Sequence, residues 1–279
     1  MFRVIWWFLE DLELKYIRLY KFRGKIKMFK KKIKALASFL KALSSGVIIY
    51  QMGKVGSTSI SFSLGKKVPH IHSFGPDITN YFFKRPVKKR NYINYLIKKV
   101  ILFFFKLKKE PKIITLVRDP LSRNVSAFFH YLEETNKHEY ENLIIDEYMS
   151  LFNKRMPHDT PLIWFQNELE KYFNIDVYGY EFDKEKGWNI IQKGKVKVLI
   201  LQMEKLNENE DVIAEFLNKP DFKLVRANTA SNKNYIETYN EFKSKFKPNK
   251  QLIDILYNSK YMEHFYTNAE RNIFVKKWR

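Results

Sequence analysis

The residues best suited to chemistry follow a short apolar run, in the stretch QMGKVGSTS at positions 51–59. Two glycines there permit the unusual backbone angles with which a loop turns successive N–H groups toward an anion. Lys54 adds a mobile cation, and the helix that should begin directly afterwards adds positive potential at its N-terminus. The spacing predicts a phosphate-binding loop made of Gly53, Lys54, Val55, Gly56, Ser57, Thr58 and Ser59. The alternative is a plain strand-to-helix turn, where Gly and Ser are common.

This loop differs from the one in nucleoside triphosphatases. Their pattern, G-x-x-x-x-G-K-[ST], places the lysine after the last glycine, whereas Lys54 precedes Gly56. No strand ends in an aspartate suited to hold magnesium, since the strand expected over 195–202 ends in Gln202. The sequence therefore predicts a P-loop-like anion site. It lacks the lysine position and the magnesium-binding aspartate that hydrolysis of a nucleoside triphosphate uses.

A second strand-to-helix motif, LVRDPLSRNVS, occupies positions 116–126. Arg118 stands at the expected strand end and offers a planar guanidinium for a phosphate. Ser126 follows eight residues later on a helix that starts at Pro120, a favoured first position for proline. An ordinary alternative is open, in which Arg118 pairs with Asp119 and Ser126 is simply a small helical residue.

The order of the two motifs resembles the sulfotransferase superfamily, whose donor is 3′-phosphoadenosine 5′-phosphosulfate (PAPS). This resemblance implies that the 53–59 loop cradles the 5′-phosphosulfate and that Arg118 and Ser126 hold the 3′-phosphate. It also implies that the sulfuryl group is transferred to an acceptor hydroxyl. PAPS would then be the co-substrate, and no metal is expected.

A closer resemblance extends over most of the chain. The stretches IYQMGKVGSTSI, HIHSF, RDPLSRNVSAFF, DVYGYEFDKEKG and LYNSKYMEHFY resemble the bacterial family named putative capsular polysaccharide synthesis proteins, which is related to the sulfotransferases. That family often shows an Asn-Lys-Trp-Tyr signature. The nearest match here is Asn232, Lys233, Asn234 and Tyr235, with asparagine in the place of tryptophan.

Sulfuryl transfer to a hydroxyl needs a general base and a group that stabilises the leaving oxygen. Lys54 is the candidate for the leaving oxygen, because it shares the loop with the 5′ end. His70 and His72 lie two apart on an expected strand and so share one face. HxHxF also resembles the base-bearing strand of carbohydrate sulfotransferases. His72 is slightly preferred over His70 as the base, and a purely structural role for either is the alternative.

The elements that must position these residues alternate between strands and helices. Strands are expected over 47–51, 68–74, 112–117 and 195–202, with small ones within 177–194, and helices over 57–65, 87–109, 120–134, 142–154, 160–173, 204–218 and much of the last 45 residues. This alternation predicts an α/β fold with a parallel central sheet and helices on both faces. We expect a single sulfotransferase-like domain over 46–279.

The net charge of +21 is concentrated in two stretches. Residues 1–45 hold 12 basic and 3 acidic residues, and residues 84–112 hold 11 basic and 1 acidic. Residues 1–45 should form a basic, amphipathic helical extension, whose stripe over 17–43 packs on the core, contacts an anionic membrane or forms a coiled-coil contact. With no cysteine and no evident secretory signal, a cytoplasmic location is expected, with peripheral contact at the inner membrane face.

The predicted function is a PAPS-dependent sulfotransferase acting on a hydroxyl of a capsular or surface glycan. Two alternatives are open: a nucleotide-dependent kinase with an atypical phosphate loop, and a non-catalytic basic protein that binds glycan or nucleic acid. No specific nucleic-acid partner is expected, because no recognised binding motif is present.

Overall fold

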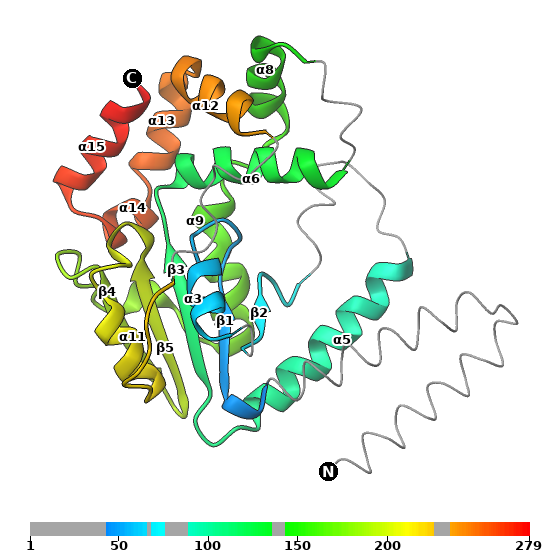
Figure 1. Cartoon of the computed structure of the whole chain (residues 1–279), viewed down its shortest axis with the longest axis vertical. Helices are drawn as coiled ribbons and strands as arrows, with labels where there is room; N and C mark the ends of the chain where they lie inside the picture. The colour runs from blue at the N-terminus through cyan, green and yellow to red at the C-terminus, as the bar shows by residue number, and fades with distance from the viewer. Residues whose placement is uncertain (1–42, 66–67, 76–88, 136–142, 226–234) are drawn as a thin grey trace, which may run out of the picture.

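A five-stranded sheet forms the centre of the molecule (Figure 1). The computed structural model describes residues 43–65, 68–75, 89–135, 143–225 and 235–279. The sheet has the order β2-β1-β3-β5-β4. Its strands are β1 (Val47–Tyr50), β2 (His70–Ile71), β3 (Lys112–Val117), β4 (Trp188–Lys193) and β5 (Val196–Gln202).

The central strands are apolar because both of their faces are covered. Every residue of β1 is buried, and so are the last five residues of β3 and of β5. Parallel strands with helices on both faces have this continuous apolar character rather than alternation. The predicted α/β class is confirmed, and β1, β3 and β5 lie within one residue of their predicted bounds.

One edge of the sheet departs from the expected parallel arrangement. The strands β1, β2, β3 and β5 are parallel, whereas β4 pairs antiparallel with β5, so the sheet is mixed. Only Gly194 and Lys195 connect β4 to β5, and Gly194 takes a φ of +58°. A two-residue connection can only form a hairpin, because a parallel pair needs a crossover of a dozen or more residues.

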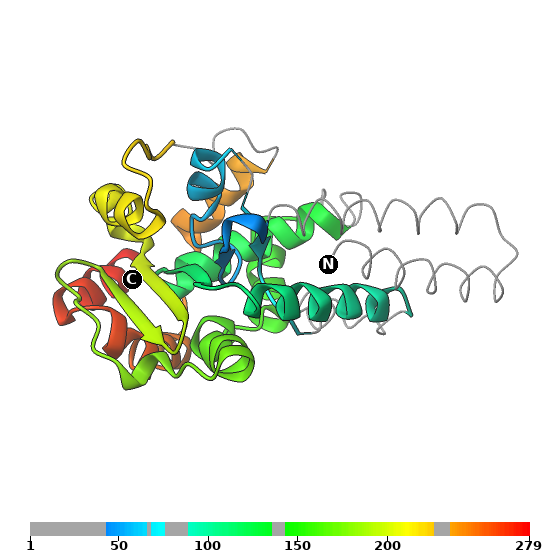
Figure 2. The same ribbon diagram turned by 90° about the horizontal axis from the view of Figure 1, so that it is seen from below.

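Helices cover the sheet on both sides, with α3 and α11 on one face and α9 on the other (Figures 1 and 2). The α-helices are α3 (Thr58–Ser63), α5 (Lys89–Lys106), α6 (Pro120–Thr135), α8 (Ile145–Arg155), α9 (Thr160–Phe165), α10 (Lys171–Phe173), α11 (Glu210–Leu217), α12 (Ile236–Lys245), α13 (Lys250–Tyr257), α14 (Lys260–Phe265) and α15 (Asn268–Trp278). A π-helical turn, η2 (Gln166–Glu170), joins α9 to α10. Within the described ranges, no helix is long and apolar enough to cross a lipid bilayer.

Two sequence-based expectations were wrong in detail. The strand expected over 68–74 is reduced to the two residues of β2. The small strand expected at the start of 177–194 is instead a 3₁₀ turn, η3 (Val177–Gly179), because the Asp176 side chain accepts a hydrogen bond from the Tyr178 N–H at 3.0 Å. The amphipathic helix expected over 17–43 lies almost wholly outside the described residues, so the boundary at residue 46 stays a prediction.

A buried carboxylate joins β1, the segment after β2, and the π-helical turn. Glu168 is 5% exposed, and its carboxylate accepts hydrogen bonds from the Tyr50 hydroxyl, from Ser73 Oγ at 2.7 Å and from the Phe74 N–H at 2.9 Å. The Trp164 indole also donates to the His72 carbonyl at 3.0 Å. These bonds hold the segment that carries His70, in β2, and His72, directly after it.

Replacing the buried acceptor should loosen this region. In Glu168→Gln, an amide N–H₂ replaces one of the two accepting oxygens and faces donors, so we expect a loss of about 1–3 kcal/mol in unfolding free energy. Urea denaturation would measure it. Glu170→Gln, an exposed neighbour on the same turn, is the matched control and should change stability by less than about 0.5 kcal/mol. Equal stability of the two variants would contradict the role of Glu168.

Candidate functional site

The two sequence motifs meet at the carboxyl ends of adjacent strands. β1 and β3 are parallel neighbours, with Val47 opposite Lys112. The chain leaves β1 toward α3 and leaves β3 toward α6, while β2 and β5 lie on opposite sides of this pair. In open α/β sheets, ligands bind at such a switch point, outside the strand ends.

The loop between β1 and α3 has an unusual backbone. Lys54 and Gly56 have positive φ angles of 72° and 84°. A Cβ atom at Gly56 would also come within 2.9 Å of Met203 Cγ, so this position requires glycine. The left-handed angle at Lys54 is uncommon for a residue with a side chain and marks a loop held by its surroundings.

Two arginines from the second motif hold this loop from outside. Arg118 Nη1 donates to the Lys54 carbonyl at 2.8 Å, and Arg123 Nε donates to the Gly53 carbonyl at 2.9 Å. Arg123 is 2% exposed, whereas Arg118 is half-buried. The bonds turn two successive loop carbonyls toward the arginines.

The backbone of Arg118 is itself held by the C-terminal helices. The Tyr261 hydroxyl on α14 accepts from the Arg118 N–H at 2.9 Å and donates to the Arg118 carbonyl at 3.0 Å. Next to it, the Asp119 carboxylate accepts from the Tyr257 hydroxyl of α13 at 2.6 Å. The guanidinium therefore extends from a backbone position fixed by two other helices.

The candidate histidines form a compact polar cluster with Gln51 and Ser57. His70 Nε2 lies 2.9 Å from both Ser57 Oγ and Gln51 Nε2. His72 Nδ1 lies 3.2 Å from the Gln51 carbonyl oxygen, and a Cβ at Gly53 would lie 3.9 Å from His72 Cε1. The same Nδ1 also lies 3.3 Å from Gln51 Nε2, so it faces both an acceptor and a donor. In the tautomer that donates Nδ1–H to the Gln51 carbonyl, Nε2 keeps its lone pair.

Both histidines are shifted toward the neutral form. Burial lowers the pKa of His70 to about 4, with a smaller contribution from His72. Desolvation also lowers the pKa of His72, as do the charges of Arg123, Lys54 and Lys98, although part of the His72 side chain is exposed to solvent. A neutral imidazole with an exposed edge can accept a proton near pH 7.

Two further lysines approach Arg118 from the end of the chain. Lys277 Nζ on α15 donates to Ser122 Oγ in the first turn of α6 at 2.8 Å. The pKa of Lys243 on α12 is lowered by desolvation and by the nearby charges of Lys277 and Arg118. Cations from three separate segments, Arg118, Lys243 and Lys277, therefore lie near one another, which is favourable for an anion with more than one charge.

The remaining predicted residues have different surroundings. Val55 is fully buried and anchors the loop, and the Ser57 hydroxyl is engaged with Gln51 and His70. Thr58 and Ser59 are half-buried in the first turn of α3, and Ser126 is half-buried on α6. The signature residues 232–234 lie outside the described residues, while Tyr235 stacks on Phe129 with ring centroids 5.7 Å apart.

Sequence reasoning missed several residues that build this site. Glu168, Lys243 and Lys277 are more than 90 residues from the motif that each supports, and they carry no local signal. Arg123 was visible only as a second arginine near Arg118. Among the described residues, no three His, Asp or Glu side chains are grouped as metal ligands. The expectation of a metal-free site stays a prediction.

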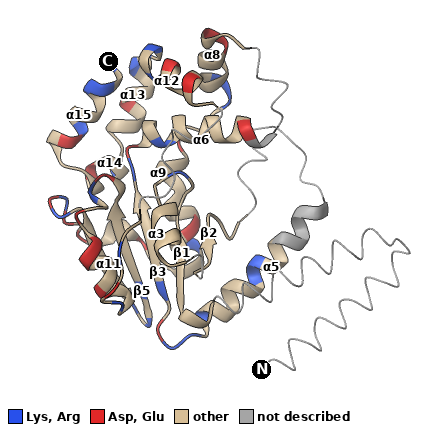
Figure 3. Ribbon diagram, viewed as in Figure 1, with Lys and Arg blue, Asp and Glu red and all other residues tan. Residues whose placement is uncertain are grey.

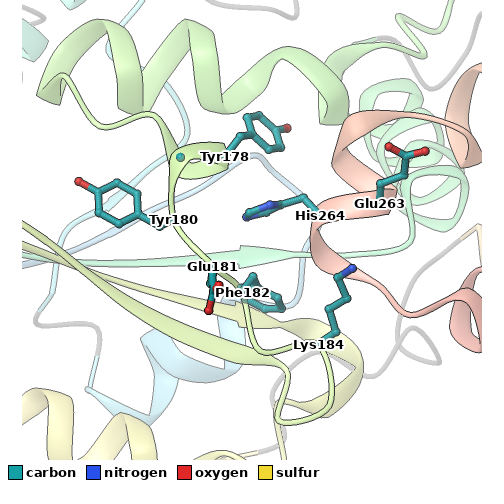
Figure 4. Close-up of a pocket in the computed structure, with 8 residues that line it drawn as sticks. Tyr178, Tyr180, Glu181, Phe182, Lys184, Glu263 and His264 are labelled. Atoms are coloured by element: carbon teal, nitrogen blue, oxygen red, sulfur yellow. The ribbon is translucent and has the colours of Figure 1, made fainter.

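A separate hollow of about 460 Å³ lies on the β4 side of the molecule (Figure 4). It is lined by Tyr178, Gly179, Tyr180, Glu181, Phe182, Lys184, Glu263 and His264. Tyr261 and Phe265 pack between this hollow and Arg118, since Phe265 contacts the Tyr178 ring and Tyr261 contacts the Arg118 backbone. None of the predicted anion-binding residues lines it.

A histidine that supports α6 should make stability depend on pH. Asn124 Nδ2 donates to the His158 carbonyl at 3.0 Å, and burial lowers the pKa of His158 from 6.5 to about 4. Between these values the unfolded chain binds a proton that the folded chain excludes. The contribution of the neutral His158 ring to the unfolding free energy should therefore be fully present above pH 6.5. The unfolding free energy should fall by up to about 3 kcal/mol as the pH drops toward 4.

Urea denaturation at pH 7.5, 5.5 and 4.5 would measure this loss. His158→Leu removes the titrating ring, so the variant should lose less stability than the wild type over the same range. Other groups titrate in both proteins, and the difference between the two slopes isolates His158. Parallel slopes would contradict the lowered pKa.

Comparison with known proteins gives one match. A family model described as putative capsular polysaccharide synthesis protein (NKWYS) matches residues 138–267. This range contains β4, β5 and the helices α8 to α14, whereas the loops at 53–59 and 118–126 precede it. No curated protein and no solved structure matches the chain. Over residues 138–267, the chain is therefore similar to the putative capsular polysaccharide synthesis proteins.

Proposed function

We propose that the protein transfers the sulfuryl group of PAPS to a hydroxyl of a capsular or surface glycan. The observation that carries this proposal is the direct contact between the two motifs, through Arg118 to the Lys54 carbonyl and Arg123 to the Gly53 carbonyl. A donor with a phosphosulfate at one end and a phosphate at the other needs two anion sites side by side.

The donor's two ends would lie on different parts of this site. The 53–59 loop, with Lys54, would receive the 5′-phosphosulfate. The half-buried guanidinium of Arg118 and the hydroxyl of Ser126 would receive the 3′-phosphate. One nitrogen of Arg118 already donates to the loop, and a guanidinium has five N–H donors, so others remain for a phosphate.

The reaction would proceed by in-line displacement at sulfur. The acceptor oxygen forms a bond to sulfur while the bond between sulfur and the bridging phosphate oxygen breaks. In the tautomer that donates Nδ1–H to the Gln51 carbonyl, Nε2 of His72 takes the acceptor proton, and 3′,5′-ADP leaves with the bridging oxygen. Lys54 would stabilise the charge that develops on that oxygen, an interaction that strengthens as the bond breaks.

The geometry favours His72 over His70 as the base. Both ring partners of His70, Ser57 and Gln51, lie within the protein at 2.9 Å, which suits a structural role. His72 has an exposed edge beside Gly53. The glycan acceptor rests on the family description, which concerns capsular polysaccharide synthesis.

The nucleotide assignment predicts discrimination at the 3′ position. Arg118→Ala should weaken binding of 3′,5′-ADP by about 1.5–3 kcal/mol, roughly 10- to 150-fold, because a hydrogen bond to a charged group is lost. Binding of 5′-ADP, which lacks the 3′-phosphate, should change much less. Calorimetric titration without magnesium would measure both dissociation constants.

Two variants make this test specific. Ser126→Ala should reproduce the selective loss of 3′,5′-ADP affinity without touching the bond from Arg118 to Lys54. Arg155→Ala removes an exposed arginine at the end of α8 and should leave both affinities unchanged. Equal wild-type affinity for the two nucleotides would reject the PAPS assignment, and magnesium-dependent ATP binding in its place would support a kinase.

The base assignment predicts a separate loss of turnover. His72→Ala should lower the transfer rate by about 10²–10⁴ while 3′,5′-ADP affinity stays near normal. Because the pKa of His72 is lowered from 6.5, the wild-type rate should decline only below that pH. Transfer of sulfur-35 from labelled PAPS to glycans extracted from the producing organism would measure the rate. His264→Ala, in the separate hollow, is the control, and full activity of His72→Ala would refute this role.

A further inference from the structure

The helix α5 has one buried face and one apolar face that is exposed. On the buried face, Phe105 is fully buried and its ring lies 6.1 Å from that of Phe173 on α10. On the other face, Leu96, Phe103 and Leu107 are 43%, 59% and 58% exposed. These three large apolar side chains gain nothing from the core of the described chain.

The exposed side chains form a continuous stripe. Leu96 and Phe103 are seven residues apart, and Leu107 follows four residues after Phe103, so all three share one side of the helix. Leu107 lies one residue beyond α5, but its N–H still donates to the Phe103 carbonyl at 3.2 Å. We call Leu96, Phe103 and Leu107 the α5 stripe.

Basic side chains flank this stripe. Lys99 Nζ lies 5.2 Å from the centre of the Tyr172 ring, and Lys106 Nζ lies 5.4 Å from that of Phe173, and both lysines are exposed. These rings place the two ammonium groups along the border of the apolar face. Residues 89–106 contain no acidic residue, and in Figure 3 the coloured part of α5 carries a basic segment and no acidic one.

We propose that the α5 stripe docks on an anionic lipid surface, with the three apolar side chains at the level of the headgroups and Lys99 and Lys106 beside the phosphates. A basic helix with an apolar stripe lies in the plane of a membrane interface. Each lysine near an anionic surface contributes about 1 kcal/mol. This proposal does not depend on the sulfotransferase assignment.

Other occupants fit the surface less well. A second copy of the chain packed on the same face would bring the lysine borders of both copies together, and like charges across an interface are unfavourable. Nucleic acid would use the lysines but not three apolar side chains. The lipid surface is the partner that matches both the apolar centre and the basic border.

Docking through α5 would also orient the candidate site. Lys98 Nζ on the same helix donates to the Gly75 carbonyl at 3.1 Å, three residues after His72. The segment that carries the histidines is therefore tied directly to the proposed membrane-facing helix.

Because the chain contains no cysteine, a single introduced cysteine can be labelled at a chosen position. In the full-length chain, Phe103→Cys labelled with the polarity-sensitive dye NBD should show a blue shift and a rise in emission on addition of phosphatidylcholine vesicles containing phosphatidylglycerol. Ile273→Cys, 63% exposed on α15, is the matched control and should show neither. A label at residue 103 that responds no more than the control would overturn the proposal, whatever other parts of the chain do.

Vesicle sedimentation separates the apolar from the electrostatic contribution to lipid binding. Leu96→Ser/Phe103→Ser/Leu107→Ser should lower partitioning at least tenfold, and Lys99→Gln/Lys106→Gln should lower it about fivefold per lysine. Ile255→Ser/Ile273→Ser, two apolar residues exposed elsewhere, should bind as the wild type does. All replaced side chains are exposed, and unchanged circular dichroism would verify folding.

Two results would contradict the lipid assignment. Unchanged partitioning of the triple serine variant would show that the α5 stripe makes no lipid contact. A wild-type dimer in lipid-free solution that the same variant dissociates would show that a second copy covers the stripe. Light scattering of the wild type and of the triple serine variant would detect such a dimer and its loss.

Discussion

The buried carboxylate of Asp119 joins the end of β3 to the C-terminal helices, and the geometry of the candidate site depends on it. Asp119 is 2% exposed and accepts from the N–H groups of Leu121 and Ser122 at 3.3 Å and from the Tyr257 hydroxyl at 2.6 Å. The Trp278 indole lies 3.5 Å away. Since a buried carboxylate is costly unless its oxygens are paired, α6, α13 and α15 must come together around it.

This requirement extends to the loop between β1 and α3. Once the start of α6 is placed, Arg118 and Arg123 project toward β1 and bind the carbonyls of Lys54 and Gly53. Those bonds accompany the positive φ angles of the loop. Loop geometry, and with it any anion affinity, is therefore coupled to the packing of the last helices, which lie more than 130 residues away in the chain.

The distribution of charge follows from the same arrangement. The two buried acids near the site, Asp119 and Glu168, accept hydrogen bonds from neutral hydroxyl and amide groups. Neutral donors thus satisfy these buried oxygens, and the cations around the loop are not needed for it. The positive charge of Arg118, Lys243 and Lys277 is then concentrated at one place, where it lowers the cost of bringing a multiply charged anion to the strand ends.

The sequence alone was enough to predict the α/β class and the strand-to-helix loop that follows β1. Continuous apolar runs mark β1, β3 and β5 because such strands are buried on both faces. Gly56 marks the loop because its φ of +84° is disfavoured for residues with a side chain. The hairpin that makes the sheet mixed was predictable in principle from the short connection at Gly194 and Lys195. These features are encoded by neighbouring residues.

Only the tertiary structure decided how the motifs meet. No local pattern shows that Glu168 holds the histidine segment, that Lys277 reaches Ser122, or that Arg118 binds the loop it was expected to complement. Each of these contacts joins residues more than 60 positions apart. Such contacts depend on how whole helices pack around buried polar groups, which is a property of the assembled core rather than of any one segment.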